Sequence, residues 1–558
     1  MNRRLSPPII ALLLFLTAFF GAFLFYPVAY ILRGAFFVDG KFTLEFFHLA
    51  VASPLTLKSM VNSFGLGLVV TVLTTLLALP LAHIFTRYEF RGKGLLSALL
   101  LVPMIMPPFV GAIGMRQFFA RYGSVNLLFG THIDWLGESG FWGVVILQTL
   151  NLYPIMFLNV SAAMVNVDPN LREAAQNLGA NPWRVFRTVT MPLVLPGYFA
   201  GAILVFIWAF TDLGTPLIFG YNRLVAVQIF DRVTDIGTNP MGYVLVCVVL
   251  MLTVALFVVS KRLLASKRYE MMPRGHTAGA EQRVSGWRVA LIHAGVLAVI
   301  AVALLPHLSV VLQSLSDKWF FTVLPSQMSL HHCGQVFAYP LTASSVRNSL
   351  VYSSLSAFVD LALGVMIAYI LTRRNIPGAA VLDAVAMLPL ALPGLVLAFG
   401  YLGGFNVPLS WLNPRSNPTV LLVVAYSVRR LPYIVRSAYA GFQQTSVTLE
   451  EASLNLGASP LRTLRKITIP LVMANLVAGT VLTFSYAILE VSDSLILAMK
   501  ERYYPMTKAI WALLGRIEPD SVSVASAMGI LGMVILTVSL FVASKLLGKK
   551  MGQLFRAG

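Results

Sequence analysis

Two stretches of this sequence repeat one another almost residue for residue, and they decide the fold. The first is Leu171-Arg-Glu-Ala-Ala-Gln-Asn-Leu-Gly-Ala-Asn-Pro182, and the second, 278 residues further along, is Leu449-Glu-Glu-Ala-Ser-Leu-Asn-Leu-Gly-Ala-Ser-Pro460. A loop between apolar runs has no packing reason to recur in this way unless both copies do the same job. The chain is therefore predicted to consist of two copies of one structural unit.

The repeat extends to both sides of these stretches. Residues 62–87 match residues 348–373 at an offset of 286, and the change from 286 to 278 places a length difference of eight residues between the third and fourth helices. The chain is predicted to divide into a first half (1–262), a linker (263–288) rich in charged and small residues, and a second half (289–558).

The composition is that of a membrane protein. Of the 558 residues, 58% are hydrophobic and only 11% are charged, with a mean hydropathy of +0.79. The formal charge of +19 comes from short basic clusters between apolar runs, which is typical of cytoplasmic loops and argues against nucleic-acid binding. No small-residue cleavage site follows the apolar run that begins at Ile9, so this run is interpreted as a retained first helix. The two cysteines, Cys247 and Cys333, form neither a disulfide framework nor a Cys-rich metal site.

A spanning helix takes about 20 mostly apolar residues, and the sequence offers twelve candidates. They are centred near residues 20, 74, 105, 153, 206, 250, 300, 360, 390, 430, 482 and 535. If these helices alternate in direction, nearly all basic clusters lie on one side, which the positive-inside rule assigns to the cytoplasm together with both termini. The loop from Lys500 to Arg516 is the exception. The prediction is an all-α membrane protein with about twelve transmembrane helices in two six-helix repeats. Six helices per half make the two repeats parallel, related by an axis along the membrane normal.

Each copy of the repeated loop is predicted to form two short helices joined by a turn. A carboxylate, Glu173 or Glu451, lies in the early turns of the first helix, where the helix dipole favours negative charge. Gly179 or Gly457 follows where the chain must turn, because glycine readily adopts positive φ at helix ends. The result is a rigid elbow at the predicted cytoplasmic end of each half.

At this loop the chain resembles the permease subunits of type I ATP-binding-cassette importers, whose signature is Glu-Ala-Ala, three residues, Gly, and later an apolar-x-apolar-Pro ending. Both copies fit, except that Ser453 replaces the third small residue and Leu464 the usual aromatic residue. The resemblance implies that each loop docks into a cleft on a separate ATPase subunit. The coupling positions that it implies are Glu173, Ala174, Ala175, Gly179, Glu451, Ala452 and Gly457.

The resemblance also implies partners, a location and a cargo. The expected partners are two ATP-binding-cassette ATPase subunits, a periplasmic substrate-binding protein and the lipid bilayer of the bacterial inner membrane. The segment from Tyr426 to Arg436 and the fused layout look like the iron(III) branch of these permeases, which also includes proteins for thiamine and aminoethylphosphonate. Iron(III) is the expected cargo, with thiamine, aminoethylphosphonate or another small anion or polyamine as alternatives.

The sequence contains no Gly-x-x-x-x-Gly-Lys-Ser/Thr phosphate loop, so the backbone cradle that holds nucleotide phosphates is missing. ATP is expected to be used by the partner, and this chain is expected to be a transport permease that is not an enzyme and binds no cofactor or metal. An ion-gradient-driven secondary transporter is the alternative class, because twelve helices in two parallel halves also suit it. The duplicated loop disfavours that alternative. A channel is disfavoured because no selectivity-filter loop is repeated.

Five charged residues are expected within the membrane, where such residues usually face a cavity or a partner. Asp212 and Glu490 occupy equivalent positions near the outer end of the fifth helix of each half, and they either flank the pathway or pair with basic groups. Asp360 lacks a charged counterpart and is a candidate to pair with Arg429 or Arg430. These arginines alternatively contact the substrate or extend to the outer interface.

Two further features have open interpretations. Prolines interrupt the third helix of each half, at Pro103, Pro107 and Pro108 in the first half and at Pro389 and Pro393 in the second. They predict kinks that serve as hinges, line a constriction with carbonyl groups, or only bend the helix. The cluster His331-His332-Cys333 could ligate a soft metal, but it is interpreted as part of a loop.

Overall fold

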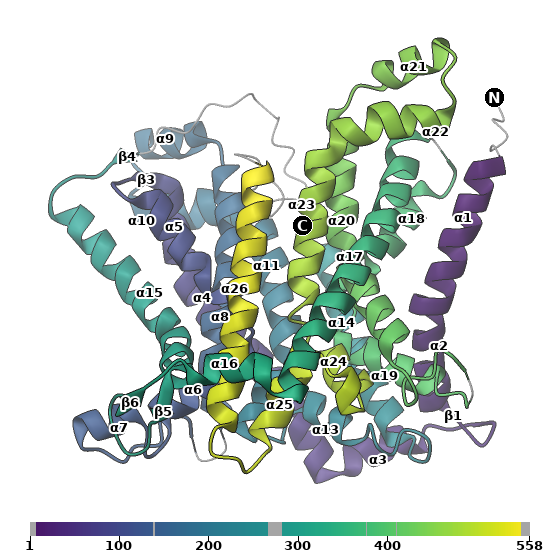
Figure 1. Cartoon of the computed structure of the whole chain (residues 1–558). Helices are drawn as coiled ribbons and strands as arrows, with labels where there is room; N and C mark the ends of the chain where they lie inside the picture. Colours follow the sequence, from purple (N-terminus) through teal and green to yellow (C-terminus); the bar gives the residue numbers. More distant parts are fainter. Residues whose placement is uncertain (1–6, 138–139, 266–281, 375, 409, 548–558) are drawn as a thin grey trace. The chain divides into compact units, whose positions relative to one another are not determined.

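The computed structural model describes residues 7–137, 140–265, 282–374, 376–408 and 410–547, and nearly all regular structure in them is helical (Figure 1). The predicted linker lies mostly outside the described residues. The chain clusters into two compact units. Unit 1 contains residues 1–53, 229–250 and 333–558, and unit 2 contains residues 54–228 and 251–332. The units are therefore interleaved in sequence, whereas the predicted boundaries at 262 and 289 follow the repeat.

The helices of the first half are α1 (Pro7–Phe20), α2 (Tyr26–Phe36), α3 (Glu45–Ala52), α4 (Pro54–Arg87), α5 (Lys93–Leu101), α6 (Pro108–Phe119), α7 (Ser124–Phe129), α8 (Phe141–Val165), α9 (Pro169–Asn177), α10 (Pro182–Val185), α11 (Met191–Thr211), α12 (Gly214–Phe219), α13 (Val225–Asp231) and α14 (Met241–Ala265). Short π-helical or 3₁₀ turns join some of them, namely η1 (Gly21–Phe25), η2 (Val102–Ile105) and η3 (Phe186–Thr190).

The helices of the second half are α15 (Trp287–Ser314), α16 (His331–Ala338), α17 (Pro340–Arg373), α18 (Ala379–Met387), α19 (Gly394–Gly404), α20 (Thr419–Gln444), α21 (Val447–Asn455), α22 (Pro460–Thr463), α23 (Ile469–Ala487), α24 (Ser492–Leu497), α25 (Met506–Leu514) and α26 (Ser521–Leu547), with the turns η4 (Leu388–Leu390), η5 (Leu464–Thr468) and η6 (Glu501–Tyr503). The strands form three two-residue or three-residue pairs: β1 (Phe37–Val38) with β2 (Lys41–Phe42), β3 (Tyr88–Glu89) with β4 (Gln282–Arg283), and β5 (Ser316–Lys318) with β6 (Gln327–Met328).

Eleven of the twelve predicted spans are confirmed when each bent pair is taken as one span. Among the described residues, nine helical segments are long and apolar enough to cross a membrane, and two more pass the test as bent pairs. The remaining predicted span is α20, whose 26 residues correspond to about 39 Å of helix, longer than the roughly 30 Å hydrocarbon core. Three arginines on α20 make it the least apolar of the set. Each predicted centre thus falls in a long helix or at a bend.

The proline-rich third helix of each half is sharply broken. Lys93–Ile105 meets Pro108–Phe129 at 94°, and Ala379–Leu390 meets Gly394–Gly404 at 98°. The breaks arise because Pro107 and Pro393 hold extended ψ angles of 135° and 140° just before α6 and α19 begin. The kink predicted from the prolines is confirmed in both halves.

In unit 1, the long helices α17, α20 and α23 pack against one another, and α26 packs against α23 and α25. Their common core includes Ala368 from α17, Phe442 from α20 and Leu476 from α23. Outside this core, α19 contacts both α2 and α24. It therefore lies between the first span of the chain and the short helix α24.

Unit 2 has the same plan. The helices α4, α8 and α11 pack against one another, and α6 contacts both α15 and α12. The contact of α6 with α15 is close because Gly114 lacks a side chain: a Cβ atom there would lie 2.6 Å from the carbonyl oxygen of Pro306. The Ser309 hydroxyl donates a hydrogen bond of 2.8 Å to the Gly114 carbonyl at this crossing.

Candidate functional site

The two repeated loops form the expected pairs of short helices, which we call the coupling arms. The first arm consists of α9 and α10, and the second of α21 and α22. Side chains cap each short helix at its start: the Asp168 carboxylate accepts from the Asn170 amide at 2.9 Å, and Asn181 accepts from the Arg184 amide at 2.8 Å. In the second arm, Ser446 and Ser459 do the same. Such caps satisfy amide groups that have no partner within the helix.

The turn inside each arm needs glycine for its backbone conformation. Gly179 has a φ of +83° and Gly457 a φ of +86°, and a Cβ atom at either position would meet nothing within 4 Å. The left-handed conformation, rather than lack of space, therefore favours glycine. The predicted carboxylates Glu173 and Glu451 lie on the first helix of each arm and are exposed.

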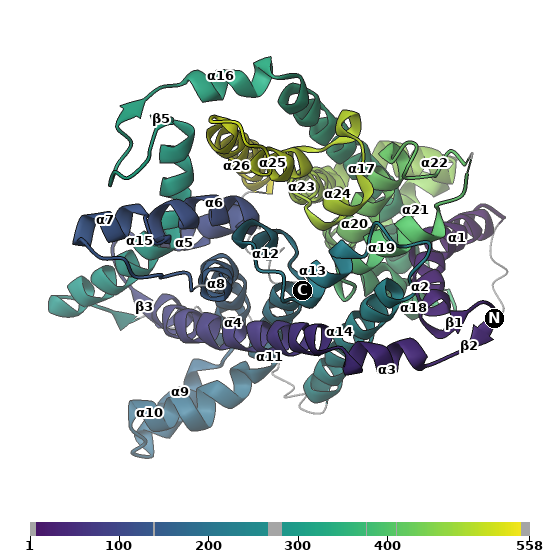
Figure 2. The same ribbon diagram turned by 90° about the horizontal axis from the view of Figure 1, so that it is seen from below.

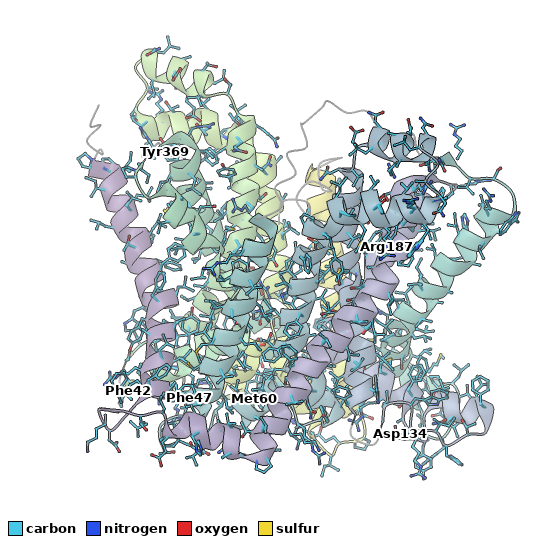
Figure 3. The ribbon with its side chains drawn as sticks, turned by 180° about the vertical axis from the view of Figure 1, so that it is seen from behind. Phe42, Phe47, Met60, Asp134, Arg187 and Tyr369 are labelled. Atoms are coloured by element: carbon cyan, nitrogen blue, oxygen red, sulfur yellow. The ribbon has the colours of Figure 1, made fainter. Side chains whose placement is uncertain are left out.

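Each arm also exposes large apolar side chains, which the sequence analysis missed. Leu178 and Leu456 are each 89% exposed, and they directly precede the two turn glycines. Trp183 and Leu461, also equivalent to one another, are 68% and 74% exposed. Exposed apolar side chains that lie close together on a surface are typical of protein interaction sites. Figure 3 labels Arg187 at the same end of unit 2 as the first arm and Tyr369 at the end of unit 1 that carries the second.

The second arm is fastened to its own unit by an ion pair. The Arg373 guanidinium, at the end of α17, donates from Nε to Glu450 Oε1 at 2.9 Å, and the two side chains are only 6% and 11% exposed. Arg373 also donates to the Thr445 carbonyl at 3.0 Å and lies over the Phe442 ring, 5.5 Å from its centroid. One buried arginine thus holds the start of α21 against α17 and α20.

The first arm lacks this ion pair. The equivalents of Arg373 and Glu450 are Arg87, at the end of α4, and Arg172, in α9. Burial and the nearby positive charge of Arg87 lower the pKa of Arg172, while Glu173 opposes the shift. Two like charges therefore face each other where the second arm has an attractive pair.

Four charged residues of the second half form a cluster beside α24: Arg429, Arg430, Glu490 and Asp493. Glu490 is 4% exposed, and its carboxylate accepts hydrogen bonds from both Arg429 and Arg430 of α20. Arg429 also lies 3.4 Å from Asp493, which is fully buried. The pairing suggested between Asp360 and these arginines is not the one observed. Asp360 accepts a hydrogen bond of 2.6 Å from the Ser427 hydroxyl instead.

Asp212 holds the equivalent place in the first half without arginine partners. Its carboxylate accepts hydrogen bonds from the Gln148 side chain at 2.9 Å and from the Gly214 and Thr215 amides at 3.2 and 3.3 Å, which caps α12. The residue equivalent to Arg429 is Asn151, whose amide donates to the Pro103 and Met106 carbonyls. In this half, the polar side chain stabilises the break in the third helix.

The repeated Asn-Ser pairs on the second helix of each half also have a clear structural role. Ser63 accepts a hydrogen bond from the Val225 amide, and Ser349 accepts one from the Met506 amide, both at 2.8 Å. Their neighbours Asn62 and Asn348 donate to backbone or side-chain oxygens in the same loops. The repeat therefore fixes the segment that follows the fifth span, just before α13 and α25.

The histidine cluster does not form the predicted loop. His331 begins helix α16, and His332 lies 3.1 Å from Asp317. Across the described part of the chain, no group of three or more His, Cys, Asp or Glu side chains is arranged to hold a metal ion.

The duplicated arms and the matching bent helices define a multi-pass membrane transport component. The chain belongs to the family of binding-protein-dependent transport system inner membrane components, which matches residues 74–269 and 361–553. The match occurs once in each half, as the repeat predicts.

Relatives of this chain include proteins with the same fused layout. It is 26% identical over 535 residues to the ferric transport system permease protein FbpB of Actinobacillus pleuropneumoniae, covering 93% of this chain and 75% of that one. It is 26% identical over 501 residues to the putative ferric transport system permease protein FbpB 1 of Haemophilus influenzae, covering 87% and 77%. The molybdenum transport system permease protein ModB of Escherichia coli K12 is 33% identical over 165 residues, which is 28% of this chain and 70% of that one. This chain is thus a fused permease of the inner membrane, similar to ferric transport permeases.

Proposed function

We propose that this chain is the complete membrane pathway of an ATP-driven importer that brings iron(III) into the cytoplasm. The observation that supports this most strongly is the pair of coupling arms, which present equivalent exposed leucines beside left-handed glycines. Such a surface suits a partner that binds both arms in the same way. Two arms on one chain correspond to two ATPase subunits per permease.

The coupling positions are Glu173, Ala174, Ala175, Gly179, Glu451, Ala452 and Gly457. In this proposal the exposed faces of α9 and α21 enter clefts on the ATPase subunits. Movement of those subunits during ATP binding and hydrolysis is then transmitted to the spans through α10 and α22. This chain binds no ATP and no cofactor, and both of its termini lie in the cytoplasm.

The cargo is proposed from the relatives whose names specify ferric transport. A periplasmic binding protein delivers it to the outer side. Thiamine, aminoethylphosphonate or another small anion or polyamine are the alternative cargoes, because the intramembrane cluster carries both signs of charge and does not itself select one class.

For Asp212, Asp360, Glu490, Arg429 and Arg430, we propose a positioning role next to the pathway. Glu490 and Asp212 lie directly before α24 and α12, and their carboxylates are occupied by protein donors. A carboxylate that is already fully bonded gains little from binding a cation. These residues therefore set the positions of the short helices after the fifth span.

Co-purification from the native membrane tests the proposal, with ATPase activity and bound partners measured on the full chain. The test variants are Gly179→Leu and Gly457→Leu. The matched controls are Gly92→Leu and Gly378→Leu, because these equivalent glycines also have left-handed φ angles of +81° and +88° and open space around them but lie outside the arms.

We expect the arm variants to insert normally but to lose ATPase subunits and uptake, while the controls keep both. Recovery of about two ATPase subunits per chain would support the importer. Wild-type chain purified without an ATPase, with uptake that collapses when the proton or sodium gradient is dissipated, would instead establish the secondary transporter.

A further inference from the structure

The two spans that begin the halves are the least buried of the nine unbent spans among the described residues. In the most apolar stretch of Pro7–Phe36 only 22% of residues are buried, and the same fraction applies to Trp287–Ser314. Each of these spans runs directly into a short β-hairpin, β1–β2 or β5–β6. In each unit the hairpin lies at the end opposite the coupling arm (Figure 1).

The first hairpin carries a cluster of phenylalanines. Phe36 stacks on Phe42 with ring centroids 6.0 Å apart and on Phe47 at 5.0 Å, and Phe37 contacts Phe42 edge-on. Phe37 and Phe42 are nevertheless 49% and 63% exposed. Figure 3 labels Phe42 and Phe47 beside the end of the first span. The cluster is therefore ordered by its own stacking while its outer surface stays uncovered.

The second hairpin is anchored at one side and exposed at the other. Trp319 is 3% exposed, packs edge-on against Phe118 of α6, and accepts a hydrogen bond of 3.2 Å at its carbonyl from the Gln117 side chain. The next two residues, Phe320 and Phe321, are 74% and 73% exposed. Phe321 holds a φ of +54°, a conformation that is unfavourable for a bulky residue. The backbone is therefore strained at Phe321, although this side chain and that of Phe320 remain exposed.

Both hairpins lie at the outer margin of their units. Helix α19 contacts both α2 and α24, and α6 contacts both α15 and α12. The span that carries each hairpin therefore lies across α19 or α6 from the short helix, α24 or α12. Figure 2 shows β1 and β2 at the edge of unit 1, and β5 at the edge of unit 2. Each hairpin therefore continues the exposed surface of its span.

We propose that these two hairpins are interfacial anchors, with their exposed phenylalanines inserted among the headgroups and upper acyl chains of the bilayer leaflet opposite the coupling arms. The 30 residues of Pro7–Phe36 correspond to about 45 Å, close to the roughly 40–45 Å thickness of a bilayer with its headgroups. The hairpin at the end of this span therefore lies at headgroup depth, where exposed phenylalanine rings can bury their apolar surface at the boundary between headgroups and acyl chains.

Lipid, rather than a docked protein, is the occupant that fits both hairpins. Their sequences are unrelated, Phe-Val-Asp-Gly-Lys-Phe in the first and Ser-Asp-Lys-Trp-Phe-Phe in the second. A lipid interface requires only aromatic side chains at the right depth, whereas a protein partner requires specific complementary contacts. The two hairpins have exposed aromatic side chains at equivalent places but no common sequence, which fits a lipid interface better than a protein partner.

Depth-dependent fluorescence quenching tests the anchors on the full chain in nanodiscs. A background with Cys247 and Cys333 replaced by serine receives a single cysteine, labelled with an environment-sensitive fluorophore, as Phe42→Cys or Phe320→Cys. Phe320 is used rather than its neighbour because the neighbour's left-handed backbone adds strain. Ile517→Cys is the matched control, an apolar residue that is fully exposed in the loop before α26.

We expect nitroxide-labelled lipids to quench both hairpin positions at least threefold more strongly than position 517, and aqueous iodide to quench position 517 more strongly. Equal iodide access at all three positions, with no quenching by lipid, would overturn the proposal. It would also be overturned if only an added periplasmic binding protein shielded the hairpin positions. Melting temperatures equal to that of the background show that the labelled variants are folded.

Discussion

The two coupling arms are alike where they face outward and different where they face their own units. Leu178 and Leu456 have the same exposure, and Gly179 and Gly457 have nearly the same φ. Behind these residues, the second arm is held by the pair Arg373–Glu450, whereas the first has two arginines in the equivalent places. The two halves thus share the exposed surface of the arm and differ in the attachment behind it.

The intramembrane carboxylates show the same contrast. Glu490 and Asp212 both precede a short helix, but Glu490 binds two arginines and Asp212 binds only neutral donors. A shared backbone task therefore survives in both halves, while the electrostatic environment has diverged.

Replacing Glu490 with glutamine should have the largest effect. It removes the carboxylate that two largely buried arginines share, leaving Arg429 only its contact with Asp493, and breaking a buried ion pair from one side costs about 3–5 kcal/mol. The matched change, Asp212→Asn, keeps an acceptor oxygen and should cost about 1 kcal/mol. Thermal unfolding of the purified chain measures both. Equal losses would mean that the arginines contribute nothing to holding α24.

Glu450→Gln should loosen the second arm. Arg373 is then left nearly buried without an ionic partner, and about 3 kcal/mol of local stability should be lost. Hydrogen exchange should become faster in α21 but not in α9. The control is Arg172→Gln, which removes a repulsion and should leave exchange in α9 unchanged or slower. Faster exchange in both variants would show that charge does not set the attachment.

Leu178→Ser and Leu456→Ser should weaken ATPase binding without affecting folding. Both side chains are almost fully exposed, so stability should stay within about 0.5 kcal/mol. Burial of a leucine at an interface is worth about 1.5–3 kcal/mol, which corresponds to roughly a 10-fold to 100-fold weaker affinity. Titration with the purified ATPase measures this. A loss confined to one variant would show that the arms dock unequally.

Arg172→Glu should have the smallest effect, and in the opposite direction. It gives the first arm the pair that the second already has, opposite Arg87. Because both side chains are only half-buried, the gain should be below about 1 kcal/mol. Hydrogen exchange in α9 should slow slightly, and the effect should weaken in high salt. Faster exchange would indicate that Arg87 is not within reach of residue 172.

The repeat was sufficient to predict the spans, both arms and the bent third helices, because each depends on local sequence that occurs twice. Contacts between segments that are far apart in the sequence were harder to predict. Asp360 is the residue predicted to pair with Arg429 or Arg430, but Glu490 is the one that does so, because nothing local fixes the register between α20 and α24. The exposure of Leu178 was missed because a single apolar residue beside a turn carries no periodicity that distinguishes a buried side chain from an exposed one.

The interleaving of the two units has a consequence for how the protein is made. Helix α2 packs against α19, which begins at Gly394, more than 350 residues later in the chain. Synthesis proceeds from the N-terminus, so α2 enters the bilayer before α19 has been synthesised. Until then, the surface of α2 that later packs against α19 is exposed to lipid. Because both halves belong to one polypeptide, α2 stays close to the ribosome while α19 is being synthesised.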